Sequence, residues 1–258
     1  MNQKSRFALA LLLCAAGLGA ADPVEFPEKA DWNDSPQLKT LADDVLELNN
    51  DVITSTELIK IDPKKKTHLT GEFRALPGKK ARLFFAFSSY DAQKQPISAI
   101  DVNAVKGSDT ELLAPVKKDD RTLKVKDASR FLPGTVVVFN TKEDYSDLPN
   151  RVRSHGFFEK AEKQPDGTWI VTLKAKAGQD FPAGTKVRAH GSGGYQYVAI
   201  TELDGSWKKL GGFCTGMAKV GLGGKEWRPG SAYVKAVIFG ARPEAPIQFR
   251  NVKLTEQE

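Results

Sequence analysis

Apolar and polar residues alternate with a period of two along most of the chain after residue 55. The segment ARLFFAFSSY (81–90) places its Leu and two of its Phe on one face, and Arg, Ser, Tyr and another Phe on the other. THLTGEFRAL (67–76) and AYVKAVIF (232–239) alternate in the same way, as half-buried β-strands do. Pro, Gly or polar turns separate these segments and no long helix intervenes, so the pattern predicts an antiparallel all-β fold.

The segment SPQLKTLADDVLELNND (35–51) has a different pattern. Its apolar residues recur at three- and four-residue steps, and Ser35 followed by Pro36 supplies an N-cap and a first-turn signal, which predicts a short helix. The same residues also fit two strands around a turn at Asp43 and Asp44. Both interpretations remain open at the level of the sequence.

The style of the strands divides the chain into three blocks. Residues 116–195 form a small all-β block that contains a hairpin with Pro165-Asp166-Gly167 at its tip. The flanks 22–115 and 196–258 together have about the size of one β-sandwich, and neither has enough strands to close one alone. Because surface loops tolerate insertions, we expect one sandwich made from both flanks, interrupted by the inserted domain.

Residues 1–21 have the organisation of a secretory signal peptide. Lys4 and Arg6 precede the apolar run FALALLLCAAGLGA, and small residues lead to Ala21, after which cleavage is expected. The sequence therefore predicts an exported protein that is secreted, periplasmic or on the cell surface. No later apolar run reaches the roughly 18 residues of a membrane-spanning helix, so no transmembrane segment is expected after cleavage.

Metal and thiol chemistry have little support in the sequence. After cleavage, Cys214 is the single cysteine and is expected to be a buried small hydrophobe. His68, His155 and His190 are not at zinc-ligand spacings, and we expect no cofactor. The acidic string KEDYSDLPN leaves a structural calcium ion as an alternative, although its spacing matches no EF-hand loop. Its carboxylates are Glu143, Asp144 and Asp147.

Positive charge is concentrated in the middle block. The chain has a net charge of +6, and residues 116–195 hold 15 Lys or Arg against 10 Asp or Glu. A basic surface attracts anionic partners, and for an exported chain with no nucleic-acid motif we expect an acidic or sulfated polysaccharide and not nucleic acid. Arg151, Arg153 and the adjacent His155 follow a Leu-Pro-Asn turn and are the candidates for an anionic ligand, because Arg forks onto carboxylate or sulfate. The alternative is a solvated Lys-rich surface that only keeps the protein soluble.

The flanks resemble a known family. The order ELIKID-PKKKTHLTGEFRAL-ARLFFAFSSYDAQKQPI, SWKKLGGF and SAYVKAVIFG-PIQFRNVKLTE is similar to the jelly-roll carbohydrate-binding modules of the galactose-binding-like superfamily. The matching positions are the turn at Tyr90, Asp91, Pro96 and Ile97, Trp207 at the start of a late strand, and a final strand from Ile247 to Leu254. The resemblance implies a jelly-roll sandwich that binds a polysaccharide. The inserted block is similar to small β units of bacterial and phage surface proteins, and that pattern has no attached activity.

Sugar recognition needs aromatic side chains for the apolar face of a pyranose and polar groups for its hydroxyls. The second face of the strands, the Gly-rich junction AHGSGGYQY and the loop GGKEWRPG supply both kinds of side chain. The carbohydrate-binding candidates are Arg82, Phe84, Tyr90, Tyr195, Tyr197, Trp227, Tyr233 and Lys235. His68, Glu72 and Arg74 would join this face if their strand shares the sheet. Burial under the inserted block or under the N-terminal segment is the alternative for Phe84 and Phe239. Trp207 is expected to pack in the core.

An enzymatic function has a weaker motif. Some jelly-roll polysaccharide lyases carry a Y.K.G.Y strand, which this chain matches only at Tyr233 and Lys235. Val237 replaces the Gly, Phe239 replaces the second Tyr, and the Gln-x-His partner that would supply a general base is absent. We therefore expect a non-catalytic glycan-binding protein. The alternatives are a structural or adhesion module without glycan binding and, behind it, a polysaccharide lyase or a glycosidase.

Overall fold

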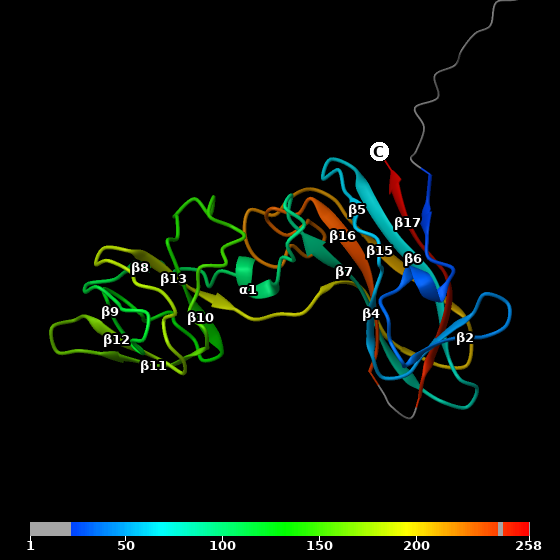
Figure 1. Cartoon of the computed structure of the whole chain (residues 1–258), viewed down its shortest axis with the longest axis horizontal. Coiled ribbons are helices and arrows are strands. Elements are labelled where there is room, and N and C mark those ends of the chain that lie inside the picture. Colours follow the sequence, from blue (N-terminus) through cyan, green and yellow to red (C-terminus); the bar gives the residue numbers. More distant parts are fainter. Residues whose placement is uncertain (1–21, 242–244, 258) are drawn as a thin grey trace, which may run out of the picture.

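The structure is a computed structural model that describes residues 22–241 and 245–257. These residues form an almost entirely β protein with two lobes, a larger sandwich and a smaller inserted lobe (Figure 1). The predicted signal peptide, residues 1–21, lies outside the described part. No helix among the described residues has the length and apolar character needed to cross a membrane.

Within the described residues, the larger lobe is a sandwich of two antiparallel sheets. The β6 sheet has the order β15 (Lys208–Cys214), β6 (Lys66–Ala75), β17 (Ile247–Gln257), β3 (Leu46–Leu48) and β2 (Leu38–Thr40), and β1 (Val24–Glu25) pairs with β17. The β7 sheet has the order β14 (Gln196–Leu203), β7 (Ala81–Tyr90), β16 (Tyr233–Gly240) and β4 (Val52–Thr54), and β5 (Ile59–Lys60) pairs with β16. The strands β3-β17-β6-β15 facing β4-β16-β7-β14 have the order of a jelly roll.

The core of the sandwich lies between these two sheets. The three inward residues of β7, Leu83, Phe85 and Phe87, are fully buried, as the alternation predicts. Phe73 of β6 meets Phe85 edge to face, with ring centroids 4.8 Å apart, and thereby joins the sheets. Cys214 is buried in the same cluster, and burial raises the pKa of its thiol to about 12. The predicted small-hydrophobe role of this cysteine is confirmed.

The predicted helix over residues 35–51 is wrong, and the alternative of two strands is confirmed. Strands β2 and β3 form an antiparallel hairpin, and the amide of Val45 donates to the carbonyl of Ala42 across the turn, at 3.3 Å. Asp43 and Asp44 have φ values of 58° and 57°, as both central residues of a type I′ turn require. The three-residue strands carry too few positions to show a period of two, so their apolar spacing resembles that of a helix.

The Asp44→Gly substitution should raise the free energy of unfolding by about 0.5–1 kcal/mol, because an L-residue is strained at positive φ and glycine is not. Urea denaturation measures the change. Lys39→Gly on the adjacent strand is the control, and it should lower stability because glycine weakens a strand. A destabilised Asp44→Gly variant would contradict the argument.

The inserted lobe has its own core between two small antiparallel sheets of described residues. One sheet has the order β10 (Thr135–Phe139), β13 (Lys186–Gly191) and β8 (Thr110–Glu111), and the other β11 (Phe158–Lys163), β12 (Trp169–Leu173) and β9 (Thr122–Val125). The turn between β11 and β12 is at the predicted hairpin tip. Since β8 pairs with β13 and Leu112 belongs to this core, the lobe takes in residues before the boundary at 116 that the sequence suggested.

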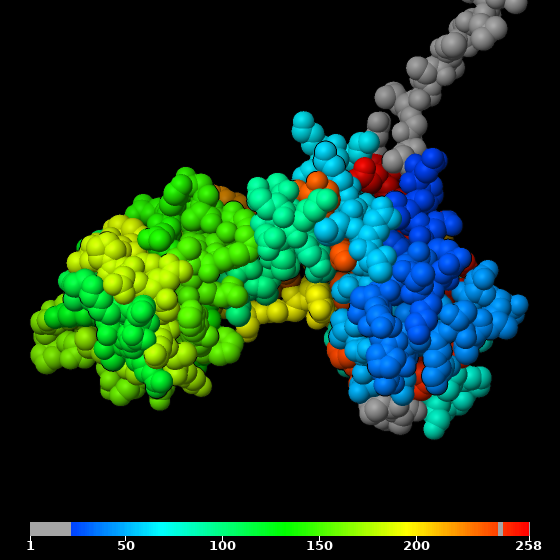
Figure 2. All heavy atoms as spheres, viewed as in Figure 1, coloured from blue at the N-terminus to red at the C-terminus, as the bar shows by residue number. Residues whose placement is uncertain are grey.

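A narrower neck joins the two lobes (Figure 2). The outgoing segment follows β7 and contains α1 (Ala99–Val102), the returning segment runs from β13 into β14, and the short helix η1 (Lys29–Asp31) lies in the sandwich before β2. The amide of Gly221, from the loop between β15 and β16, donates to the carbonyl of Val102 at 2.8 Å. Asn103 donates from its side chain to the carbonyl of Ser192 at 3.1 Å. Three segments that are distant in sequence are thus tied together at the neck.

Candidate functional site

The outer face of the β7 sheet combines several predicted candidates. Tyr233 of β16 lies opposite Tyr90 of β7, and Lys235 lies opposite Ser88. Because alternate residues of a strand share a face, all four project from the sheet away from the core. The tertiary fold therefore brings together residues from two strands that are about 140 positions apart in the sequence.

An aromatic cluster covers the middle of this face. Phe84 stacks on Phe239 with ring centroids 5.2 Å apart and an interplanar angle of 20°. Tyr197 of β14 lies 5.7 Å from Phe84, and the guanidinium of Arg82 lies over the Phe84 ring at 5.4 Å. Phe84 and Phe239 are half-buried, while Tyr197 is 38% exposed. The inserted lobe therefore does not cover this cluster, and aromatic surface remains open to solvent.

A pocket of about 380 Å³, here called the neck pocket, adjoins this face where the inserted lobe begins. Its walls come from strands β4 and β7 and from both segments of the neck. Its lining residues are Thr54, Ser88, Tyr90, Pro96, Ile97, Ser98, Ala99, Gly193, Gly194, Tyr195 and Arg228. Tyr195 is 37% exposed, and burial of the remainder raises its pKa, which keeps its hydroxyl protonated as a hydrogen-bond donor. The pocket thus offers two Tyr side chains with hydroxyl groups and a guanidinium.

The close packing of the glycines shapes the pocket. A Cβ atom on Gly193 would lie 3.0–3.1 Å from Leu222 and from Ala99, and one on Gly194 would overlap the hydroxyl of Tyr197. The returning segment can therefore pass this close to α1 and to Tyr197 only because it has no side chains there. The predicted junction site at the Gly-rich segment is accordingly a closely packed wall that carries Tyr195.

Arg228, which the sequence analysis missed, is the buried charge of the neck pocket. Its side chain is 3% exposed, and its two terminal nitrogens donate to the carbonyls of Ile97, at 3.0 Å, and Gly194. Its Nε has no hydrogen-bond partner among the described residues. Burial lowers the pKa of the guanidinium. In the sequence, the following Pro and Gly indicate only a turn. Nothing in this local pattern indicates that Arg228 contacts both segments of the neck.

Trp227 is not an exposed binding residue, and that prediction is wrong. The side chain is 0% exposed and meets Phe87 edge to face at 5.0 Å in the core of the sandwich. Within the Gly-rich loop, Trp227 forms a parallel β-bridge with Met217, so the flexible composition of the loop does not imply exposure. Gln196 fastens this loop by donating from its side-chain amide to the carbonyl of Gly224 at 3.2 Å.

Arg151 and Arg153 contact the neck and are ion-paired. Arg151 pairs with the buried carboxylate of Asp91 at 2.8 Å, and Arg153 pairs with the buried carboxylate of Asp101. Burial opposes ionisation of Asp91, but hydrogen bonds from Gln95 and Arg151 together hold its pKa below the ordinary value. The expectation that both arginines are available for an anionic ligand is therefore corrected. Arg151 is exposed, but both guanidinium groups bind carboxylates that lie outside residues 116–195.

His155 is exposed and lies against Gly178 of the inserted lobe, where a Cβ atom would overlap its ring. The outward residues of β6, His68, Glu72 and Arg74, lie on the opposite face of the molecule because β6 belongs to the other sheet. They do not join the candidate surface.

Trp207 is half-exposed on the outside of the β6 sheet. Its ring lies between the guanidinium groups of Arg74 and Arg250, at 4.4 and 4.5 Å. The predicted place in the core is therefore wrong. The two cations hold the indole on the outer face of a sheet where the sequence suggested an inward side chain.

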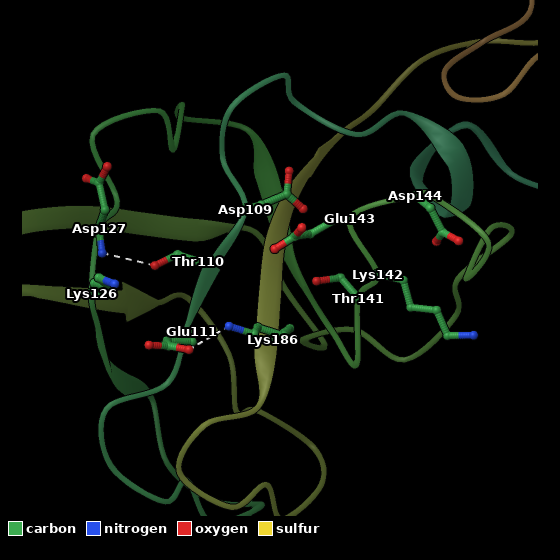
Figure 3. Close-up of a pocket in the computed structure, with 10 residues that line it drawn as sticks. All are labelled: Asp109, Thr110, Glu111, Lys126, Asp127, Thr141, Lys142, Glu143, Asp144 and Lys186. Atoms are coloured by element: carbon green, nitrogen blue, oxygen red, sulfur yellow. Dashed lines mark hydrogen bonds and ion pairs between the residues drawn. The ribbon is translucent and has the colours of Figure 1, made fainter.

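A second cavity, of about 720 Å³, lies in the inserted lobe around β8 and β13 (Figure 3). In this view the Glu111 carboxylate and the Lys186 ammonium point toward each other, and they form an ion pair of 2.6 Å. Asp109 binds the buried Arg188 at 3.3 Å. None of the buried polar atoms without partners in the described chain belongs to this cavity. In this respect it differs from the neck pocket.

The acidic string considered for calcium has a defined hydrogen-bonding role. The Asp147 carboxylate accepts from Arg188, at 2.9 Å, from Asn150, at 2.9 Å, and from the amide of Lys142, at 3.1 Å. Asp144 accepts from the amide of Ser146 at 3.0 Å. Among the described residues, no group of three or more His, Cys, Asp or Glu is placed to hold a metal ion.

Comparisons of the chain with protein-family models, with curated proteins and with solved structures gave no match. The functional argument therefore depends on the geometry of the two lobes and on the chemistry of their surfaces.

Proposed function

We propose that this chain is an exported, non-catalytic carbohydrate-binding protein that holds a polysaccharide on the outer face of the β7 sheet. The resemblance to the jelly-roll carbohydrate-binding modules of the galactose-binding-like superfamily is part of this proposal. The proposal that the protein is exported is based on the signal-peptide pattern of residues 1–21.

The observation that carries the proposal is the open aromatic cluster of Phe84, Phe239 and Tyr197. Burying an aromatic face against an apolar surface is favourable, and a pyranose offers such a surface on one side of its ring. Ser88 and Tyr90 lie beyond the cluster on β7 and supply hydroxyls toward the neck pocket. The face is thus apolar in its centre and polar at one end, as a sugar site with a fixed orientation requires.

Tyr197→Ala should weaken polysaccharide binding about tenfold, because one exposed aromatic anchor typically contributes a kcal/mol or more at an interface. Affinity gel electrophoresis against a panel of plant, algal and bacterial polysaccharides measures the effect. The matched control is Trp207→Ala, which removes a half-exposed aromatic from the opposite sheet and should leave binding unchanged.

Equal retardation of the wild type and Tyr197→Ala on every gel that retains the protein would contradict the proposed face. The alternative function, a structural or adhesion module, predicts a different result. The chain would then bind no polysaccharide in the panel and would form a specific oligomer, which sedimentation velocity would detect.

A further inference from the structure

Among the described residues that line the neck pocket, Arg228 is the one charged side chain, and none is acidic. Asp91 and Asp101, the buried carboxylates of the outgoing segment, are each occupied by an arginine of the inserted lobe. Arg228 makes no ion pair within the described chain, although Asp101 is close enough to influence it electrostatically. Its partners are two backbone carbonyls, which satisfy hydrogen bonds and do not cancel a charge. A buried cation without a counter-ion is costly in free energy.

Further cations stand beside the pocket. Lys235 projects from β16 directly opposite Ser88, a residue of the pocket wall, and forms no ion pair with a described residue. Lys94 lies over the ring of Tyr233 at 5.7 Å, at the same end of the sheet. The neck pocket is therefore lined by hydroxyl groups, including those of two Tyr side chains. Three cations from different segments, Arg228, Lys235 and Lys94, lie in or beside it.

We infer that the neck pocket binds the carboxylate of an acidic sugar, a uronate unit of the polysaccharide, with Arg228 as its buried counter-charge and Lys235 at its rim. This inference rests on the proposed function, because the same chain of sugars would continue over the aromatic cluster. A carboxylate fits the position of Arg228, since this guanidinium lines the pocket, binds only neutral carbonyls and can pair with a planar anion. The positive charge that would bind the acidic sugar thus lies at the neck, on Arg228. Arg151 and Arg153, the candidates predicted from the sequence, instead form ion pairs between the inserted lobe and the neck.

The test compares polygalacturonate, alginate and hyaluronate, each with its own methyl-esterified form, for binding to the full chain at fixed ionic strength. Esterification keeps the sugar and removes the charge. At least one acid form should bind about tenfold or more tightly than its ester, the effect of a charge-assisted hydrogen bond. Lys235→Gln and Arg228→Gln should each reduce this ratio severalfold, while Arg228→Lys should retain part of it.

Matched controls remove the same charges from the opposite sheet: Lys209→Gln for the lysine and Arg250→Gln for the arginine. Neither should change the ratio of acid to ester binding. Because Arg228 also joins the two neck segments, its variants are compared with wild type by thermal melting. If Arg228→Gln does not fold, Lys235→Gln decides the result.

Equal binding of acids and esters, with loss of both in Tyr197→Ala, would overturn this inference and leave the proposed function standing. If the chain bound none of the polysaccharides, both the inference about the neck pocket and the proposed function would be contradicted. A comparable preference for dextran sulfate over dextran that Lys235→Gln abolishes would overturn the carboxylate assignment and identify a sulfated ligand. An acid preference that persists unchanged in Lys235→Gln and in folded Arg228→Gln would also exclude this pocket.

Discussion

Arg188→Met should lower the free energy of unfolding of the inserted lobe by about 3–5 kcal/mol, the typical cost of removing one partner of a buried ion pair. Arg188 is fully buried on β13, and its Nη2 binds the buried carboxylate of Asp147 at 2.9 Å. It also donates to the carbonyl of Lys142 at 3.2 Å and lies over the ring of Tyr145 at 4.7 Å. Without it, Asp147 remains buried with no counter-charge.

Urea denaturation with amide hydrogen exchange measures this effect and localises it. Exchange should accelerate in β10, β13 and the acidic loop before it changes in the sandwich. Lys176→Met is the control, because Lys176 pairs with Asp119 on the surface and exposed pairs contribute about 0–1 kcal/mol. The double variant Arg188→Met with Asp147→Leu should recover part of the loss, since it leaves no unpaired charge. Wild-type stability of the single variant would contradict the buried-pair argument.

The free energy of unfolding should also fall by about 3 kcal/mol as the pH is lowered from 6.5 to 4, because His190 stays neutral in the folded protein over this range. Its Nδ1 bonds to the carbonyl of Ile100 at 2.7 Å, and its Nε2 accepts from Arg188 at 3.1 Å. Burial lowers the pKa of His190 to about 4. The hydrogen bond to the carbonyl of Ile100 opposes this shift most strongly, the charge of Arg188 adds to it, and the carboxylates of Asp147 and Asp101 oppose it.

The sign follows from proton binding. Between pH 6.5 and 4 the unfolded chain takes up a proton at this position that the folded chain does not, so acid favours unfolding. The stabilisation is complete above pH 6.5 and is lost progressively toward pH 4. Glu72 and Asp91, whose pKa values are lowered in the folded state, add their own losses only below their ordinary values of 4.5 and 3.8.

Urea denaturation at pH 7, 6, 5 and 4 follows this dependence. His190→Gln should flatten the profile between pH 6.5 and 4, and the amide can still bond to the carbonyl of Ile100. His155→Gln is the matched control, because His155 is exposed, and its profile should follow that of the wild type. Parallel profiles for His190→Gln and the wild type would show that another group titrates in this range.

The two stability predictions concern the same cluster on β13. Arg188 and His190 are two residues apart, so they point to one side of the strand, and together they connect the acidic loop to α1 in the neck. Loss of either side chain should therefore loosen the neck as well as the inserted lobe. Glycan binding by Arg188→Met then tests whether the neck pocket needs a rigid inserted lobe.

The class of fold and the inward faces of the long strands follow from the pattern of residues alone. Ten-residue strands such as β6 and β7 carry enough alternating positions to assign Phe73 and Phe85 to the core without any knowledge of their neighbours. Burial of Cys214 followed from its chemistry. The short hairpin of β2 and β3 gave two interpretations, because a three-residue strand samples too little of the period.

Which strands share a sheet and which charged side chains form pairs depend on the three-dimensional arrangement of the chain. Apolar and polar residues alternate in the same way in β6 and β7, yet the two strands belong to opposite sheets. The outward residues of β6 therefore lie on the other face of the sandwich and are not part of the candidate site. The burial of Trp227 and the pairing of Arg151 with Asp91 depend on loops that approach from distant parts of the chain. Arg228 became a candidate for the same reason: a buried charge without a counter-ion is a property of its surroundings, which no local pattern of residues records.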